Sequence, residues 1–224
     1  MTDTVILKAL GALLTYPAAD LRAALPEIAA AIEADGLLGK DDKRAVAGLI
    51  EELVAAEQLD AEERYVELFD RGRTTSLNLF EHVHGESRER GAAMVDLSQT
   101  YERAGYRLAA NELPDYLPVL LEFLASRQLV EARDMLVDCA HILRALGEAL
   151  RDRDSRYRAV FAALLTIAGE DQFNVDGRSA VKAEERSIDE EWLDEQVIFG
   201  SGATQSCGAT RPQTSILRFV PKVS

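Results

Sequence analysis

The chain has 224 residues, 47% of them hydrophobic, so it is long enough to bury a core without disulfides or a structural metal. It carries 39 acidic and 25 basic side chains, which gives a formal charge of −14 at pH 7. Because such a charge repels nucleic acid and anionic lipid, we expect no nucleic-acid partner.

The cysteines and the N-terminal residues predict a cytoplasmic protein. Cys139 and Cys207 are too far apart for a C-x-x-C motif, which fits a reducing compartment. The first 17 residues contain Asp3 and one lysine, Lys8, but no basic n-region of an export signal. No apolar run approaches the ~20 residues of a membrane helix, so we expect no direct membrane insertion.

Proline spacing and apolar periodicity predict an all-α fold. A proline inside a helix costs about 3 kcal/mol, and no proline occurs between Glu27 and Leu113 or between Val119 and Arg211. Apolar residues in both intervals recur at spacings of three and four. We therefore expect one helical-bundle domain of about seven or eight helices over residues 1–196, followed by a flexible, mildly basic tail over residues 197–224.

The expected helices of the first half are one ending before Tyr16-Pro17, one from Asp20 to about Ala34, one from about Asp41 to Gln58 and one opening at Asp60. Asp60 and Glu63 have the spacing of a capping box. The period then breaks, and Gly72 to Gly85 is expected to be a loop with at most one short helical turn.

Further helices are expected from Ser87 to Gly105, Leu113 to Ser126, about Leu129 to Arg151 and Ser155 to Ala168. Apolar density falls from Gly169 onward, apart from one helical turn expected around Trp192. The tail contains Arg211, Arg218 and Lys222 but no carboxylate. Its Gly, Ser and Thr residues show no core pattern.

The segment Glu81-His82-Val83-His84-Gly85-Glu86 places two imidazoles between two carboxylates. Residues two apart on a helix face away from each other, so His82 and His84 could ligate a metal together only in extended backbone. The alternatives are that both histidines bond to loop backbone or contact a partner. Glu86-Ser87-Arg88-Glu89-Arg90 then resembles a solvated, ion-paired helix start with Ser87 as the N-cap.

The segment from Asn111 to Leu124 is the most informative. On a helical wheel it has a leucine face and an opposite face that contains Asp115, Pro118 and Glu122. Pro118 is expected to bend this helix, and Tyr116 and Phe123 to flank its acidic side. This arrangement fits a groove for a basic amphipathic segment, or else a bent surface helix with solvated acids. Either way, Asp115 and Glu122 are expected to tolerate charge reversal.

Three motifs carry a family resemblance: Tyr65-x-x-Leu68-Phe69, the stretch from Leu79 to Gly91 that reads LFEHVHGESRERG, and Glu112-Leu113-Pro114-Asp115. With them the chain resembles the NarJ-type respiratory nitrate reductase molybdenum cofactor assembly chaperones over most of its length. Wider kinship is implied with the maturation chaperones of dimethyl sulfoxide and trimethylamine oxide reductases. Many of those relatives have a histidine where this chain has Tyr116.

The resemblance implies an all-helical, cytoplasmic chaperone that is not an enzyme and needs no cofactor of its own. It would bind the N-terminal segment of the nitrate reductase α subunit and assist molybdenum cofactor insertion and complex assembly. Proteins of molybdenum cofactor biosynthesis are further candidate partners. The alternatives are a metal-dependent enzyme that uses His82 and His84, and a helical scaffold or regulatory protein without a redox client.

From the motifs and the wheel together, the candidate client-binding residues are Tyr65, Leu68, Phe69, His82, His84, Glu86, Arg88, Arg90, Glu112, Pro114, Asp115, Tyr116, Pro118, Val119, Glu122 and Phe123.

Overall fold

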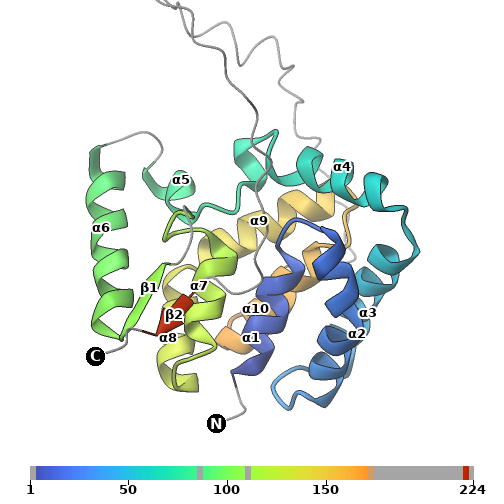
Figure 1. Cartoon of the computed structure of the whole chain (residues 1–224), viewed down its shortest axis with the longest axis horizontal. Helices are drawn as coiled ribbons and strands as arrows, with labels where there is room; N and C mark the ends of the chain where they lie inside the picture. The colour runs from blue at the N-terminus through green and yellow to red at the C-terminus, as the bar shows by residue number, and fades with distance from the viewer. Residues whose placement is uncertain (1–3, 85–87, 109–111, 172, 174–218, 222–224) are drawn as a thin grey trace, which may run out of the picture. The chain divides into compact units, whose positions relative to one another are not determined.

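The computed structural model describes residues 4–84, 88–108, 112–171, 173 and 219–221 (Figure 1). These residues form ten α-helices, one 3-10 turn and two three-residue strands, so the all-α prediction is confirmed. The elements are α1 Val5–Leu13, α2 Ala19–Ala34, α3 Lys40–Ala55, α4 Gln58–Phe69, η1 Arg73–Thr75, α5 Leu79–His84, α6 Arg88–Arg103, β1 Tyr106–Leu108, α7 Leu117–Leu124, α8 Leu129–Asp138, α9 Ala140–Asp152, α10 Arg158–Ala168 and β2 Phe219–Pro221.

The core is built around α10. After Arg158 its sequence is almost entirely apolar, and nearly every residue is buried. A helix that is hydrophobic all round must be covered on all sides, and α10 packs against α9, α8, α3 and α1. The N-terminal and C-terminal helices of the described bundle are thereby joined in one core.

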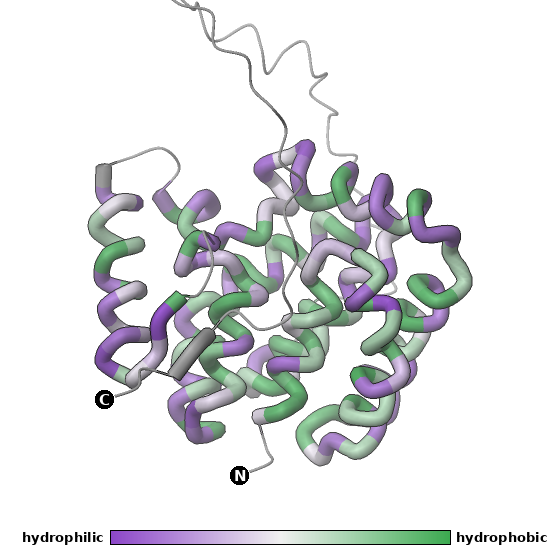
Figure 2. The backbone as a smooth tube through the Cα atoms, in the orientation of Figure 1, coloured by the Kyte–Doolittle hydropathy of each residue, from purple (hydrophilic) through white to green (hydrophobic). Residues whose placement is uncertain are grey.

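Helices α1 and α7 approach each other closely at Gly11. The first helix is hydrophobic along most of its length (Figure 2) and packs against α7, α2 and α10. A Cβ atom placed on Gly11 would lie 3.1 Å from the Cβ of Leu121 and 3.4 Å from the carbonyl oxygen of Pro118. A Cβ at this position would lie closer to Leu121 than most Cβ atoms lie to their neighbours, so Gly11 allows the close spacing of α1 and α7.

The predicted bent helix from Leu113 to Ser126 was wrong at its start. The helix begins at Leu117, and the preceding residues form a turn in which the Tyr116 N–H donates to the Leu113 carbonyl. Pro118 is therefore the second helical residue, where its missing N–H has no intrahelical partner to lose. The proline starts the helix rather than bending it.

The predicted helix from Leu129 to Arg151 is two helices separated at Cys139. The Cys139 thiol donates to the carbonyl oxygens of Met135 (3.3 Å) and Leu136 (3.4 Å), and burial raises its pKa to about 12. The apolar period continues across the break, which is why the sequence pattern did not show it.

Three smaller predictions also differ from the structure. The segment expected to be a loop contains the turn η1 and the helix α5. Asp60 is the third residue of α4, and the N-cap is Glu57 without a side-chain cap bond, so the capping box is absent. Residues 219–221 of the expected tail form β2, antiparallel to β1 with Tyr106 opposite Pro221. The rest of that tail, the turn around Trp192 and the cap Ser87 lie outside the described residues.

None of the described helices is both long enough and apolar enough to cross a membrane.

The α1–α7 spacing predicts opposite effects for two glycine substitutions. Alanine normally stabilises a helix by up to about 1 kcal/mol relative to glycine. Gly91→Ala on α6 should show that gain, because a Cβ there meets nothing within 4 Å. Gly11→Ala should instead lower the free energy of unfolding by about 1–2 kcal/mol, because neither Leu121 Cβ nor the Pro118 carbonyl can move away independently of its helix. Urea denaturation of both variants measures the difference, and equal gains would contradict it.

Candidate functional site

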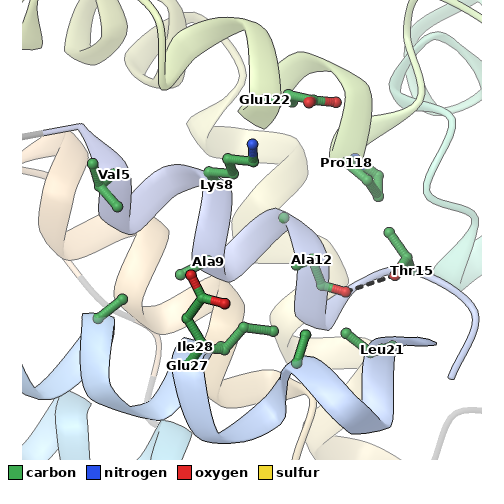
Figure 3. A pocket seen from close by; sticks show the side chains of 13 residues that line it. Val5, Lys8, Ala9, Ala12, Thr15, Leu21, Glu27, Ile28, Pro118 and Glu122 are labelled. Carbon is green, nitrogen blue, oxygen red and sulfur yellow. Dashed lines mark hydrogen bonds between the residues drawn. The ribbon is translucent and has the colours of Figure 1, made fainter. Parts of the chain in front are cut away.

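A groove of about 370 Å³ lies between three helices (Figure 3). Helix α1 forms its floor, and α2 and α7 form its walls. The lining is mostly apolar and small. We call this the α1 groove, and its residues are Val5, Lys8, Ala9, Gly11, Ala12, Thr15, Leu21, Ala24, Glu27, Ile28, Ala31, Pro118 and Glu122.

Three charged side chains interrupt this apolar lining. Lys8 is exposed and is the only charged residue of α1, and it extends toward the α7 wall, where Glu122 lies (Figure 3). Glu27 is exposed and reaches from α2 toward the floor, while Glu122 is half-buried. The lining residues therefore include one cation, Lys8 on the floor, and one carboxylate on each wall, Glu27 and Glu122.

The structure separates the residues that the helical wheel placed on one groove. Pro118 and Glu122 line the α1 groove as predicted. Asp115 does not, because it precedes the helix and is fully buried; Val119 is also buried. Phe123 borders a different hollow, of about 480 Å³, between α6, α7 and α8.

The first motif lies inside the protein at one end of the groove. The Tyr65 hydroxyl donates to the carbonyl oxygen of Leu14, the residue after α1, at 2.9 Å. It also lies 3.1 Å from the hydroxyl of Tyr116, the residue before α7. Burial raises the pKa of Tyr65, so it remains a neutral donor. Tyr65 thus fixes the end of the groove floor to the start of one wall, and its neighbours Leu68 and Phe69 are buried in the core.

Asp115 joins the other two motifs. Its Oδ2 accepts the N–H of Phe80, the second residue of α5, at 3.0 Å, and its carbonyl accepts the Leu79 N–H at 3.1 Å. The Leu117 N–H in turn donates to the Leu77 carbonyl at 2.8 Å. The carboxylate therefore caps α5 from a distant part of the chain. Burial raises the pKa of Asp115, although the Phe80 N–H and Arg90 act in the opposite direction.

The remaining motif side chains hold α5 and α6 in place. Glu81 accepts from Arg90 at 3.0 Å, and His82 Nε2 donates to the Ser76 carbonyl at 2.8 Å. The His84 ring packs edge-on against Phe80, with ring centroids 5.7 Å apart.

Two further motif residues lie beside the turn before α7. The Pro114 carbonyl accepts the hydroxyl of Tyr101, a buried residue of α6, at 2.7 Å. Glu112 is half-buried. Glu86 and the Arg88 side chain lie outside what the structure describes.

The histidine pair lies on helix α5 rather than in extended backbone, and its two rings have different partners. Within the described ranges, no group of three or more His, Cys, Asp or Glu side chains could hold a metal ion. Backbone bonding, one of the alternatives left open for these histidines, is confirmed for His82.

Sequence reasoning missed the floor and the second wall of the groove: Lys8, Gly11 and Glu27. One signal was available, because Lys8 is the only charge in the otherwise hydrophobic first helix. No local pattern could show that this helix pairs with α7.

The buried Asp115 predicts a graded series of variants. Asp115→Ala should lower the free energy of unfolding by about 1–3 kcal/mol, because the Phe80 N–H loses its acceptor. Asp115→Asn keeps an acceptor and should cost less. Asp115→Lys, which the wheel predicted to be harmless, should prevent folding because it buries an unpaired cation.

The raised pKa of Asp115 also predicts a pH dependence. The stability that its protonated form contributes is fully present below the unfolded-state pKa of about 3.9 and is lost as pH rises through the folded-state pKa. The stability of the natural chain relative to Asp115→Asn should therefore fall between pH 4 and neutral pH. Denaturation of both proteins across this range tests it, and a relative stability that rises with pH would contradict it.

Known proteins resemble this chain over most of its length. The model of the nitrate reductase delta subunit family matches residues 16–163. The nitrate reductase molybdenum cofactor assembly chaperone NarJ of Escherichia coli (strain K12) is 43% identical over 217 residues, which cover 95% of this chain and 91% of that relative. A probable chaperone of the same description, NarW of the same strain, is 40% identical over 92% of this chain and 88% of its own length. A probable NarJ of Bacillus subtilis (strain 168) is 33% identical over 72% and 86%. The chain thus belongs to the nitrate reductase delta subunit family, among the NarJ-type molybdenum cofactor assembly chaperones that its motifs resemble.

Proposed function

We propose that this protein binds the N-terminal segment of the catalytic α subunit of a respiratory nitrate reductase before the molybdenum cofactor is inserted, and assists insertion and assembly. The names of its relatives support the general chaperone role. The α1 groove supplies a surface that fits such a segment when it is folded as an amphipathic helix.

The chemistry of the groove carries this proposal. Its floor is about 14 Å long, the length of the nine-residue α1, which matches two to three turns of a docked helix. The small residues Ala9, Gly11 and Ala12 leave space above α1 for a docked helix, and both walls are mostly apolar. An apolar face laid into such a groove is a common mode of peptide recognition. The charge of −14 on the chain adds long-range attraction for a basic segment.

The proposal divides the candidate residues by what they touch. The half-buried Glu122 contacts the segment directly, and the largely buried Pro118 contributes to the wall beside it. The buried motif residues position the groove helices or the core instead; these are Tyr65, Leu68, Phe69, Asp115 and Val119. The half-buried residues next to α5 and α6 remain candidates for contact with a larger part of the α subunit; these are His82, His84, Arg90, Glu112, Pro114 and Tyr116.

The proposal makes the protein a binding partner rather than an enzyme, since client recognition needs no nucleophile or metal. It includes a cytoplasmic location, and proteins of molybdenum cofactor biosynthesis as further partners. The location follows from the cysteine spacing, the N-terminal residues and the family resemblance, the further partners follow from the resemblance alone, and neither follows from the geometry.

Charge reversal on the groove walls tests the proposal. Calorimetric titration of the full chain with a peptide from the α-subunit N-terminus should give at least tenfold weaker binding for the double variant Glu27→Lys, Glu122→Lys, because two attractions become repulsions. The loss should shrink at high salt. Folding should change little, since Glu27 is exposed and Glu122 is only half-buried.

The matched control is Glu51→Lys, Glu63→Lys, which makes the same change of net charge at exposed positions outside the groove. It should weaken binding no more than about threefold, through long-range attraction alone. Equal affinities of the groove variant and this control would place the client segment elsewhere on the chaperone.

A further inference from the structure

The three charges of the α1 groove form a pattern rather than a simple acidic patch. Glu27 belongs to one wall and Glu122 to the other, while Lys8 starts from the floor and extends toward the wall that carries Glu122 (Figure 3). We call these residues the charge triplet. Among the lining residues in the described part of the chain every other side chain is uncharged, so the charge triplet supplies the charges of this lining.

A helix lying along the floor meets the triplet in a defined order. Its lowest face lies over α1 and therefore over Lys8, while its two flanks face Glu27 and Glu122. Residues three or four apart are neighbours on a helix, so one turn can present a central residue and a flanking residue on each side. Complementarity to a minus, plus, minus pattern across the groove requires a plus, minus, plus pattern on the helix.

We propose that the groove selects a helix that carries an acidic residue flanked at i±3 or i±4 by basic residues, and that Lys8 is the specificity-determining residue that pairs with the acid. This inference rests on the proposed function, because it takes the α1 groove as the client site. It goes further because it states the order of charges on the client helix. The overall acidity of the chaperone alone would favour a client with as many basic residues as possible.

The position of Lys8 supports this role. A lysine is a compact charge on a flexible stem, so the ammonium group of Lys8, which extends toward the α7 wall (Figure 3), can reach a helix bound over the floor. A client with a basic residue at the centre would bring like charges together over the floor. The triplet therefore sets the register of a helix whose apolar contacts alone would allow sliding.

Three synthetic amphipathic peptides with identical apolar residues test the inference with the full chain. They carry basic flanking residues and, at the centre, Glu, Gln or Lys. Fluorescence anisotropy should rank their affinities as Glu, then Gln, then Lys, with steps of about threefold to fivefold, which is the range for partly exposed ion pairs. Lys8→Gln should abolish the step between Glu and Gln, and Lys8→Glu should reverse the order. The matched control Lys40→Glu, on α3 and outside the groove, should leave the order unchanged.

The outcomes separate this inference from the proposed function. If Lys8→Gln strengthens binding of all three peptides, Lys8 competes with the client's basic residues and the inference is wrong. It is equally wrong if the ratio between the Glu and Gln peptides is the same in the natural chain and in Lys8→Gln. In both cases the proposed function stands as long as Glu27→Lys, Glu122→Lys weakens binding of the α-subunit peptide. If that double variant binds normally, the proposed function fails first.

Discussion

The contact between α1 and α7 at Gly11 is the constraint on which the candidate site depends. Because no side chain separates the helices there, the floor and one wall of the groove are set at van der Waals distance, with Leu121 and the Pro118 carbonyl against the bare Cα. The Tyr65 hydroxyl then holds Leu14, the residue after α1, and the mostly apolar α10 packs against α1 inside the core. The groove is therefore built by helices that cannot shift independently, which favours a preformed site over one assembled by the client.

The motifs that mark the family serve this construction from the inside. Asp115 is buried, and its contacts join the turn before α7 to the first residues of α5. Tyr101 and the pair of Glu81 and Arg90 continue the same connection to α6. Under the proposed function, these residues act on the client through the helices that they position. Weaker client binding after mutation of one of these residues would therefore indicate a displaced helix rather than a lost contact with the client.

Much of the fold could be predicted from the sequence, because helical period and proline spacing are local properties. Of the five leucines expected on the core face of the segment from Asn111 to Leu124, Leu117, Leu120, Leu121 and Leu124 are buried, whereas Leu113 precedes the helix and is exposed. The errors arose where distant segments meet. The helical wheel wrongly includes Asp115 as a helical surface residue, because no local pattern shows that its carboxylate caps α5. The break at Cys139 lies within a continuous apolar period. The groove itself requires the pairing of the first helix with the seventh, and of its two walls only the Pro118 and Glu122 side was predicted from the sequence.

The separation between buried motif and groove lining has an evolutionary consequence. Lys8 and Glu27 are two of the three charged residues that line the groove. Both are exposed, and both lie in helices that contain none of the family motifs. Replacing such exposed residues costs little stability, so under the proposed function the client preference of the groove can change through a few surface substitutions that leave the buried motif residues untouched. On that proposal, the buried motifs mark the family of the chaperone, and the exposed groove residues decide which client it binds.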